Sequence, residues 1–216
     1  FPSKNRGGFG DGGMVVCNDD GLAERARILR MHGSKPKYFH REVGGNFRLD
    51  PLQAALLRVK LHHYDGYSQA RQENAAYYIE KLSALDGVVS ASPEHCGCAA
   101  TQEEALGRAR IVLPVPYEHN KHIWNQFTLR VRGEEQRELL RKHLADREIG
   151  SEVYYPLTMD QQECFADLPA ESRRGNGIAH QLAGEVLSIP VYPELGTEMQ
   201  DWVVKAVEEF LKSERQ

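Results

Sequence analysis

The chain has 216 residues, of which 41% are hydrophobic and 27% charged, and its formal net charge is −4 at pH 7. This composition is typical of a folded globular protein and argues against a disordered chain. Acidic and basic residues are mixed along the whole length, so we expect no nucleic-acid partner and no membrane-binding patch. No apolar run approaches the roughly 18 residues that a bilayer span needs, and we expect no signal peptide from the residues that open the sequence.

The first quarter of the sequence reads as loops around one short strand and one helix. Residues 1–13 are rich in glycine, which favours a loop. Met14–Cys17 is an apolar run that predicts a short buried strand. Asp19 is a helix-capping residue type and precedes a predicted helix from about Gly21 to Met31. A loop follows over residues 35–47, with one proline and a glycine pair.

Two further helices are predicted before residue 90. The pair Asp50-Pro51 is a strong helix start, because a capping side chain is followed by proline at the first helical position. Apolar residues then recur at helical spacing and predict a buried face, made of Leu52, Ala55, Leu56 and Val59. The second helix is predicted from Tyr67 to Leu85, and the residues expected on its buried side are Ala70, Tyr78, Leu82 and Leu85.

The second half of the sequence alternates strands with helices, which predicts an α/β fold. Ile123 and the residues at 127, 129 and 131 are apolar and alternate with Trp124 and polar residues, as in a half-buried strand. The later predicted elements are a helix at Glu134–Arg147, a strand at Ser151–Tyr155, a helix at Ile178–Val186, a strand at Leu187–Pro190 and a helix from Thr197. A small polar connection at Pro93–Gln102 separates two predicted domains, 1–100 and 101–216.

The four cysteines do not suggest a disulfide framework, and a reducing cytoplasm is the expected setting. The stretch His95-Cys96-Gly97-Cys98 could suggest a metal site. Zinc sites favour C-x₂₋₄-C spacing and four ligands, and no second cluster is present in the sequence. We therefore predict no metal site and read this stretch as a surface loop.

Lys4 stands out because it lies in the glycine-rich opening, just before the predicted strand. A lysine acts as a nucleophile only when its amine is deprotonated, which a partly buried site near other cations achieves. Taken alone, an exposed loop lysine is the commoner case. The glycines do not form a P-loop, because that motif places its lysine after the glycines and before a helix.

The opening FPSKNRGGFGDGGMVV resembles the cofactor-lysine segment of the DegT/DnrJ/EryC1/StrS family of sugar aminotransferases, which use pyridoxal 5′-phosphate (PLP). Later blocks agree in order and approximate spacing, so the resemblance covers essentially all 216 residues. These blocks are GGNFRLDPLQAALLRVKL, HIWNQFTLRV, SEVYYP and LSIPVYPEL. The resemblance implies the C-terminal half of a fold-type-I PLP-dependent transferase: the end of the large domain plus a small α/β domain.

By this resemblance Lys4 binds PLP as an imine and then serves as the base and acid of the proton shift. One amine does both jobs and PLP supplies the electron sink. Asn46 matches the family asparagine that reaches the PLP phosphate of the neighbouring subunit, which implies a homodimer with shared active sites. Without the resemblance, Asn46 reads as a loop residue that caps its own turn.

The resemblance also suggests three substrate-binding residues. Arg48 matches an arginine whose planar fork suits a carboxylate or phosphate, although an ordinary salt bridge is an alternative. Tyr154 and Tyr155 occupy the substrate-facing strand end, and either could instead be an aromatic at the edge of the core. Thr158 and Asp160 stand where many members have proline and histidine, which leaves the identity of the sugar open.

The expected reaction is transamination of a nucleotide-linked keto sugar, with glutamate as the amino donor, for polysaccharide or glycoside biosynthesis. A PLP-dependent sugar dehydratase of the same fold is the alternative enzyme, but that branch has histidine in place of Lys4. A non-catalytic dimerisation or binding module is the alternative of another class. Because the family's first half carries the acidic partner of the PLP ring, we interpret the chain as a fragment that is inactive alone.

Overall fold

The computed structural model describes residues 3–91, 107–167, 169, 171 and 176–213. The chain divides into two compact units, residues 1–67 and 68–216. The predicted connection at Pro93–Gln102 and the stretch from His95 to Cys98 lie outside the described residues. The predicted domain boundary at residue 100 lies there too and stays a prediction.

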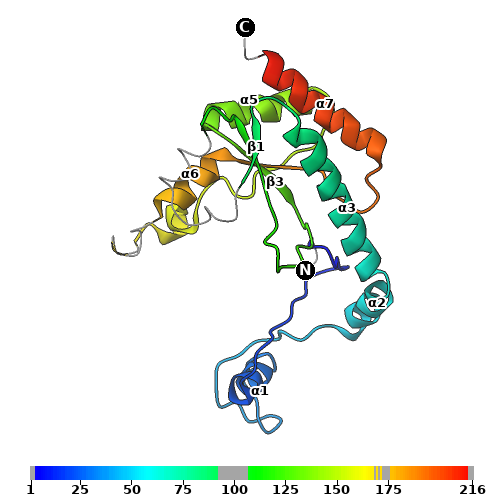
Figure 1. Ribbon diagram of the computed structural model, residues 1–216. Coiled ribbons are helices and arrows are strands. Elements are labelled where there is room, and N and C mark those ends of the chain that lie inside the picture. Colours follow the sequence, from blue (N-terminus) through cyan, green and yellow to red (C-terminus); the bar gives the residue numbers. More distant parts are fainter. Residues whose placement is uncertain (1–2, 92–106, 168, 170, 172–175, 214–216) are drawn as a thin grey trace. The chain divides into compact units, whose positions relative to one another are not determined.

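The first unit holds helix α1 (Asp20–Leu29), helix α2 (Pro51–Leu61) and the start of helix α3 (Tyr64–Ser83) (Figure 1). The Asp19 side chain caps α1 by accepting a hydrogen bond from the Leu22 backbone N–H at 2.8 Å. Pro51 lies at the first position of α2, where its missing N–H leaves no helical bond unmade. Both predicted helix starts are therefore confirmed.

Two predictions for the first unit are wrong. Met14, Val15 and Val16 form no strand and are 73%, 77% and 82% exposed. A strand needs a neighbour for its backbone groups, and the four strands in the described part of the chain pair only with one another, in the second unit. The predicted apolar face of α2 is also wrong, since Leu52 and Val59 are 76% and 64% exposed. The residues that α2 buries are Gln53 and Leu57.

The second unit is built on a four-stranded mixed sheet in the order β1-β2-β3-β4. The strands are β1 (Val88–Ser90), β2 (Ile111–Leu113), β3 (Phe127–Val131) and β4 (Val186–Ile189). β1 and β2 are parallel, whereas β2, β3 and β4 pair antiparallel. The sequence pattern predicted β3 and β4 and missed the three-residue strands β1 and β2.

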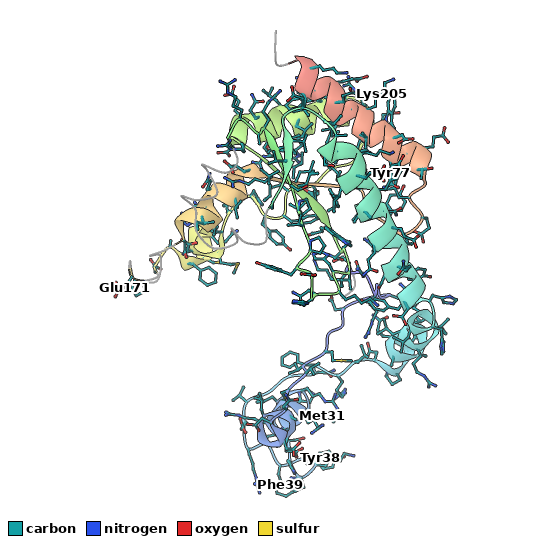
Figure 2. The ribbon with its side chains drawn as sticks, viewed as in Figure 1. Met31, Tyr38, Phe39, Tyr77, Glu171 and Lys205 are labelled. Atoms are coloured by element: carbon teal, nitrogen blue, oxygen red, sulfur yellow. The ribbon has the colours of Figure 1, made fainter. Side chains whose placement is uncertain are left out.

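The core of the second unit lies between this sheet and helices α3, α5 (Glu134–Ala145) and α7 (Thr197–Ser213) (Figure 1; side chains in Figure 2). Phe127, Leu129 and Val131 of β3 are at most 1% exposed. The helices supply the apolar side chains that complete this core, which include Tyr78, Leu82, Leu140, Leu144, Val203, Val207 and Phe210. Tyr78 and Leu82 are on the face of α3 that helical spacing predicted.

The opposite face of the sheet is polar. Thr128 and Ser188 share a 2.8 Å hydrogen bond across β3 and β4. Arg130 donates to Glu185, at the end of helix α6 (Gly177–Glu185), and both side chains of this ion pair are largely buried. The alternation along β3 therefore separates an apolar core side from a polar side, as predicted.

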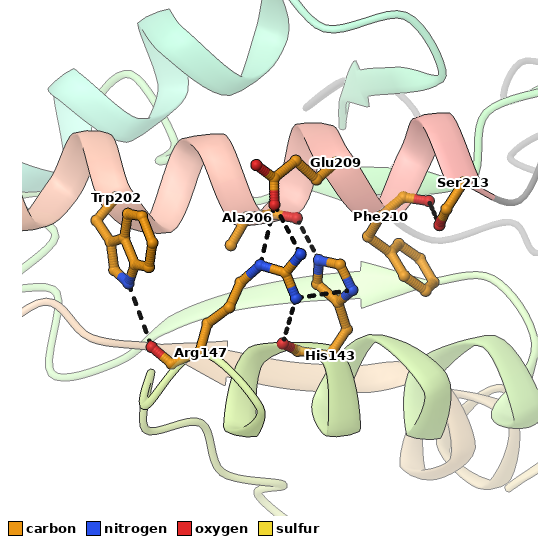
Figure 3. Close-up of polar contacts among 7 residues, drawn as sticks. All are labelled: His143, Arg147, Trp202, Ala206, Glu209, Phe210 and Ser213. Atoms are coloured by element: carbon orange, nitrogen blue, oxygen red, sulfur yellow. Dashed lines mark hydrogen bonds and ion pairs between the residues drawn. The ribbon is translucent and has the colours of Figure 1, made fainter.

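Helices α5 and α7 are joined by polar contacts as well as by the core (Figure 3). The Arg147 guanidinium donates from Nε and Nη2 to one Glu209 carboxylate oxygen, at 3.0 and 2.7 Å, and this contact lowers the pKa of Glu209. His143 Nε2 lies 2.9 Å from the Ala206 carbonyl, and Trp202 Nε1 donates to the Arg147 carbonyl at 3.2 Å. These contacts fix the C-terminal end of α5 to one side of α7.

Two local expectations differ from the structure. Trp124 was expected on the polar side of an extended strand but is 5% exposed, whereas Ile123 is 39% exposed. Trp124 has φ of 43°, a left-handed conformation that ends the strand pattern and turns the ring into the core. The predicted strand at Ser151–Tyr155 is reduced to one bridge between Glu152 and Ser188.

Within the described residues, no helix has the length and apolar character needed to cross a membrane. The elements found there are mixed α and β, as the sequence predicted.

Candidate functional site

Lys4 lies on an exposed loop of the first unit that α2 holds in place. The Lys4 carbonyl accepts a hydrogen bond from the Gly7 N–H at 2.8 Å, and Gly7 adopts φ of 58°, so a tight turn follows the lysine. The Gln53 side chain accepts from the Phe9 N–H at 3.0 Å and donates to the Gly10 carbonyl at 2.8 Å. Gln53 is only 7% exposed, so one buried amide fixes the loop that carries Lys4.

Asn46 and Arg48 lie on an exposed segment beside the C-terminal end of α1. Gly45 donates to the Leu29 carbonyl at 3.0 Å, and Phe47 donates to the Arg30 carbonyl at 3.1 Å. The backbone is therefore held while the Asn46 side chain remains exposed. Arg48 Nη1 lies 3.9 Å from the Met31 sulfur, a weak contact that leaves the guanidinium at the surface.

The glycines around Asn46 are required by close backbone packing. A Cβ atom on Gly44 would lie 2.4 Å from the Leu29 carbonyl oxygen and 2.5 Å from the Gly33 nitrogen. A Cβ on Gly33, which has φ of 67°, would lie 1.8 Å from the Glu42 carbonyl oxygen. The two glycines let the loop at 42–45 contact the end of α1, and this contact sets the position of Asn46.

Tyr154 and Tyr155 lie in the second unit, two and three residues after the Glu152–Ser188 bridge. Their rings meet edge to face with centroids 5.7 Å apart. Tyr154 is 41% exposed and lines a pocket of about 400 Å³, whereas Tyr155 is 63% exposed. Both phenol rings are therefore accessible to a ligand, and neither is a core residue.

Asp160 is the centre of a polar cluster that follows the two tyrosines. Its carboxylate accepts from the Thr158 hydroxyl at 2.6 Å and pairs with His180 Nε2 of α6 at 2.8 Å. The hydrogen bond from Thr158, together with the one from His180, holds the pKa of Asp160 well below its usual range. Thr158 and Asp160, the two departures from the family pattern, thus contact each other and fasten this loop to α6.

Three side chains of α3 hold the loops around Tyr154, and the sequence did not single them out. Arg71 Nη1 donates to the carbonyls of Trp124 and Val191 at 3.1 and 3.2 Å, and it lies 3.4 Å from that of Asn125. Gln72 and Asn74 also donate to backbone carbonyls in these segments, at His122 and Tyr192 respectively. No sequence signal marked them, because α3 carries many other polar side chains, most of which are expected to be solvent-exposed.

His122 lies beside these loops and contacts Trp124 twice. Its Nδ1 accepts from the Trp124 N–H at 3.0 Å, and the two rings have centroids 4.1 Å apart. Burial lowers the pKa of His122, which favours the neutral ring that accepts this bond. His122 therefore helps to shape the turn at Trp124.

The residues of the first unit can be tested against the needs of PLP. PLP needs an amine for covalent attachment and donors for its phosphate. In the described part of the chain the exposed Lys4 amine forms no ion pair, and the Asn46 amide and Arg48 guanidinium are exposed donors. These residues fit the group. Elsewhere in the described ranges, no cluster of three or more His, Cys, Asp and Glu suits a metal ion.

Comparison with known proteins gives the family. Residues 1–208 match the DegT/DnrJ/EryC1/StrS aminotransferase family. The chain is 39% identical over 212 residues to a pleiotropic regulatory protein of Geobacillus stearothermophilus, covering 98% of this chain and 50% of that protein. It is 36% identical over 211 residues to a dTDP-3-amino-3,4,6-trideoxy-alpha-D-glucose transaminase of Streptomyces venezuelae, covering 97% of this chain and 48% of that protein.

A solved structure shows the same likeness. The crystal structure of S. venezuelae DesV in complex with a ketimine intermediate aligns with a TM-score of 0.78 and 36% identity, over 97% of this chain and 49% of that one. The chain therefore belongs to the DegT/DnrJ/EryC1/StrS aminotransferase family. The predicted fold class, an α/β portion of a fold-type-I PLP-dependent transferase, is confirmed. The chain spans about half the length of the relatives it matches.

Proposed function

We propose that this chain carries the cofactor lysine and part of the substrate site of a PLP-dependent aminotransferase acting on a nucleotide-linked keto sugar. The observation that carries the proposal is the family match from the Lys4 loop to residue 208. The names of several relatives describe transaminases of dTDP-linked or UDP-linked sugars. The proposed amino donor is glutamate, the product feeds polysaccharide or glycoside biosynthesis, and the setting is the cytoplasm.

Each proposed site residue has a distinct task. PLP, when bound, supplies an electron sink for the carbon that is aminated. Lys4 attaches the cofactor and moves a proton, first accepting it and then returning it, which arginine could not do because it stays protonated. Asn46 donates its amide to a phosphate oxygen without adding charge. Arg48 binds a carboxylate or phosphate with its planar fork, and the rings of Tyr154 and Tyr155 contact the substrate.

The proposed assembly is a homodimer in which Asn46 serves the partner's site. Two features support a role in recognition rather than in folding: the side chain is exposed, and its backbone is fixed by the neighbouring Gly44 and Gly45 contacts. We also propose that turnover requires residues beyond these 216, because the relatives that the chain matches are about twice as long.

Covalent trapping tests the role of Lys4 without relying on turnover. The chain is incubated with PLP, reduced with borohydride and mapped by mass spectrometry, and we expect the label on Lys4. Lys4→Ala should lose this labelled peptide, whereas Lys37→Ala, which removes an exposed lysine of the same unit, should keep it. Equal labelling of several surface lysines, with none preferred at Lys4, would contradict the assignment.

A further inference from the structure

The pocket beside Tyr154 lies entirely within the second unit. Its volume of about 400 Å³ is in the range of small-molecule sites, about 300–1,000 Å³. Three segments far apart in the sequence form its walls, at residues 125–126, 150–154 and 188–192. When the segments that form a pocket are already fixed, little conformational entropy is lost on ligand binding.

The walls of this pocket are held by partly buried hydrogen bonds from α3. Arg71 contacts main-chain carbonyls of two walls, at residues 124–125 and at Val191. The third wall is attached through the paired backbones of Glu152 and Ser188, which exchange hydrogen bonds of 3.0 and 2.8 Å. Asn74 Nδ2 adds a 2.8 Å bond to the Tyr192 carbonyl. The pocket is therefore preformed in the folded unit.

The chemistry of the lining suits an uncharged, hydroxylated ring. Asn125 and Gln126 are half-buried and offer amide groups that both donate and accept. Tyr154 and Tyr192 offer partly exposed aromatic rings, which pack against apolar ring faces. The carboxylate of Glu152 would repel a phosphate, whereas it can accept hydrogen bonds from hydroxyl groups. Arg71 is the cation in this lining, and its Nη1 is directed at the main chain.

We propose that this pocket binds the sugar ring of the nucleotide-linked substrate. Asn125, Gln126 and Glu152 form hydrogen bonds with the ring hydroxyls, and Tyr192 packs against a face of the ring. The phosphates then lie outside the pocket, away from Glu152. The proposal rests on the proposed function and adds residues that determine which sugar is accepted. It assigns specificity to the amides at 125 and 126 and to the carboxylate at 152.

Sugar-dependent binding to the chain tests the proposal, using dTDP-glucose and UDP-N-acetylglucosamine as probes and dTDP and UDP as sugarless controls. Saturation-transfer NMR should show transfer to sugar-ring protons of at least one probe, and that probe should bind more tightly than its sugarless control. Gln126→Ala should weaken its binding about fivefold, the effect of one lost hydrogen bond. Gln69→Ala, a matched change at an exposed α3 position, should leave the dissociation constant unchanged.

A second variant keeps the test decisive if Gln126→Ala does not fold. Tyr192→Ala should also reduce transfer to the ring protons, while Tyr38→Ala, at a tyrosine of the first unit that is 77% exposed, should not. The proposal is overturned if neither sugar probe binds, if neither binds more tightly than its sugarless control, or if the pocket variants bind like wild type. If the sugar probes bind but PLP is not trapped on Lys4, the proposed reaction is rejected and the pocket assignment stands. If PLP is trapped on Lys4 but the sugar probes do not bind, the pocket assignment is rejected and the proposed reaction stands.

Discussion

Replacing Arg71 with methionine tests whether this side chain holds the candidate substrate pocket together. Nη1 carries two N–H groups and lies within 3.4 Å of three carbonyl oxygens, those of Trp124, Asn125 and Val191. Hydrogen bonds from a charged group contribute about 1.5–3 kcal/mol each, so two bonds give an upper range of about 3–6 kcal/mol. Since Arg71 is only half-buried, water replaces part of this, and we expect a loss of about 2–4 kcal/mol.

Urea unfolding followed by tryptophan fluorescence measures this loss, because Trp124 adjoins the contact and the chain has only two tryptophans. Arg71→Lys should lose less, since an ammonium keeps the charge but not the planar fork. Arg141→Met is the matched control: its ion pair with Glu138 is exposed, so its effect should stay below about 0.5 kcal/mol. An Arg71→Met variant within about 0.5 kcal/mol of wild type would refute the reasoning.

Two further predictions follow from single contacts. Gly44→Ala places a Cβ 2.4 Å from the Leu29 carbonyl and should break the two hydrogen bonds of Gly45, a local loss of about 2 kcal/mol that faster amide exchange in α1 would report. In the control Gly13→Ala, where a Cβ meets nothing within 4 Å, the amides of α1 should exchange at the wild-type rate. Equal α1 exchange rates in the Gly44 and Gly13 variants would contradict the close approach of Gly44 to Leu29. The lowered pKa of Asp160 means that its contribution to stability is complete above the unfolded value of about 4 and declines as the pH falls below it. In Asp160→Asn, the free energy of unfolding should therefore fall less steeply between about pH 4 and 2 than in the wild type. Urea titrations at several pH values measure this fall, and the same pH dependence in both proteins would argue against the Asp160 contacts.

The elements that sequence patterns predicted are those whose determinants are local. Asp19 and Pro51 mark helix starts because capping depends on a few adjacent residues. Alternation predicted β3 because five residues are enough to show a period of two. β1 and β2 have only three residues each, too few to display a period. Trp124 was misplaced because a left-handed backbone angle leaves no mark in hydrophobic spacing.

The candidate site likewise contains residues that the sequence identified and residues that it did not. Lys4, Asn46, Arg48, Tyr154 and Tyr155 were named through the family resemblance, and their roles remain predictions. The side chains that support these segments could not be read from the sequence, because their partners are distant along the chain. Gln53 contacts a residue 44 positions away, and Arg71 contacts one 120 positions away. A polar residue on a helix looks the same in sequence whether it meets water or a buried carbonyl.

The exposed run from Met14 to Val16 has a practical consequence for handling the chain. Three consecutive apolar residues, two of them β-branched, combine high strand propensity with backbone groups that no strand of the described residues covers. Such a segment is a template for edge-to-edge pairing between molecules. Preparations of this chain therefore call for low protein concentrations, and self-association should increase as the concentration is raised. A charged residue at position 15 is the simplest way to limit it.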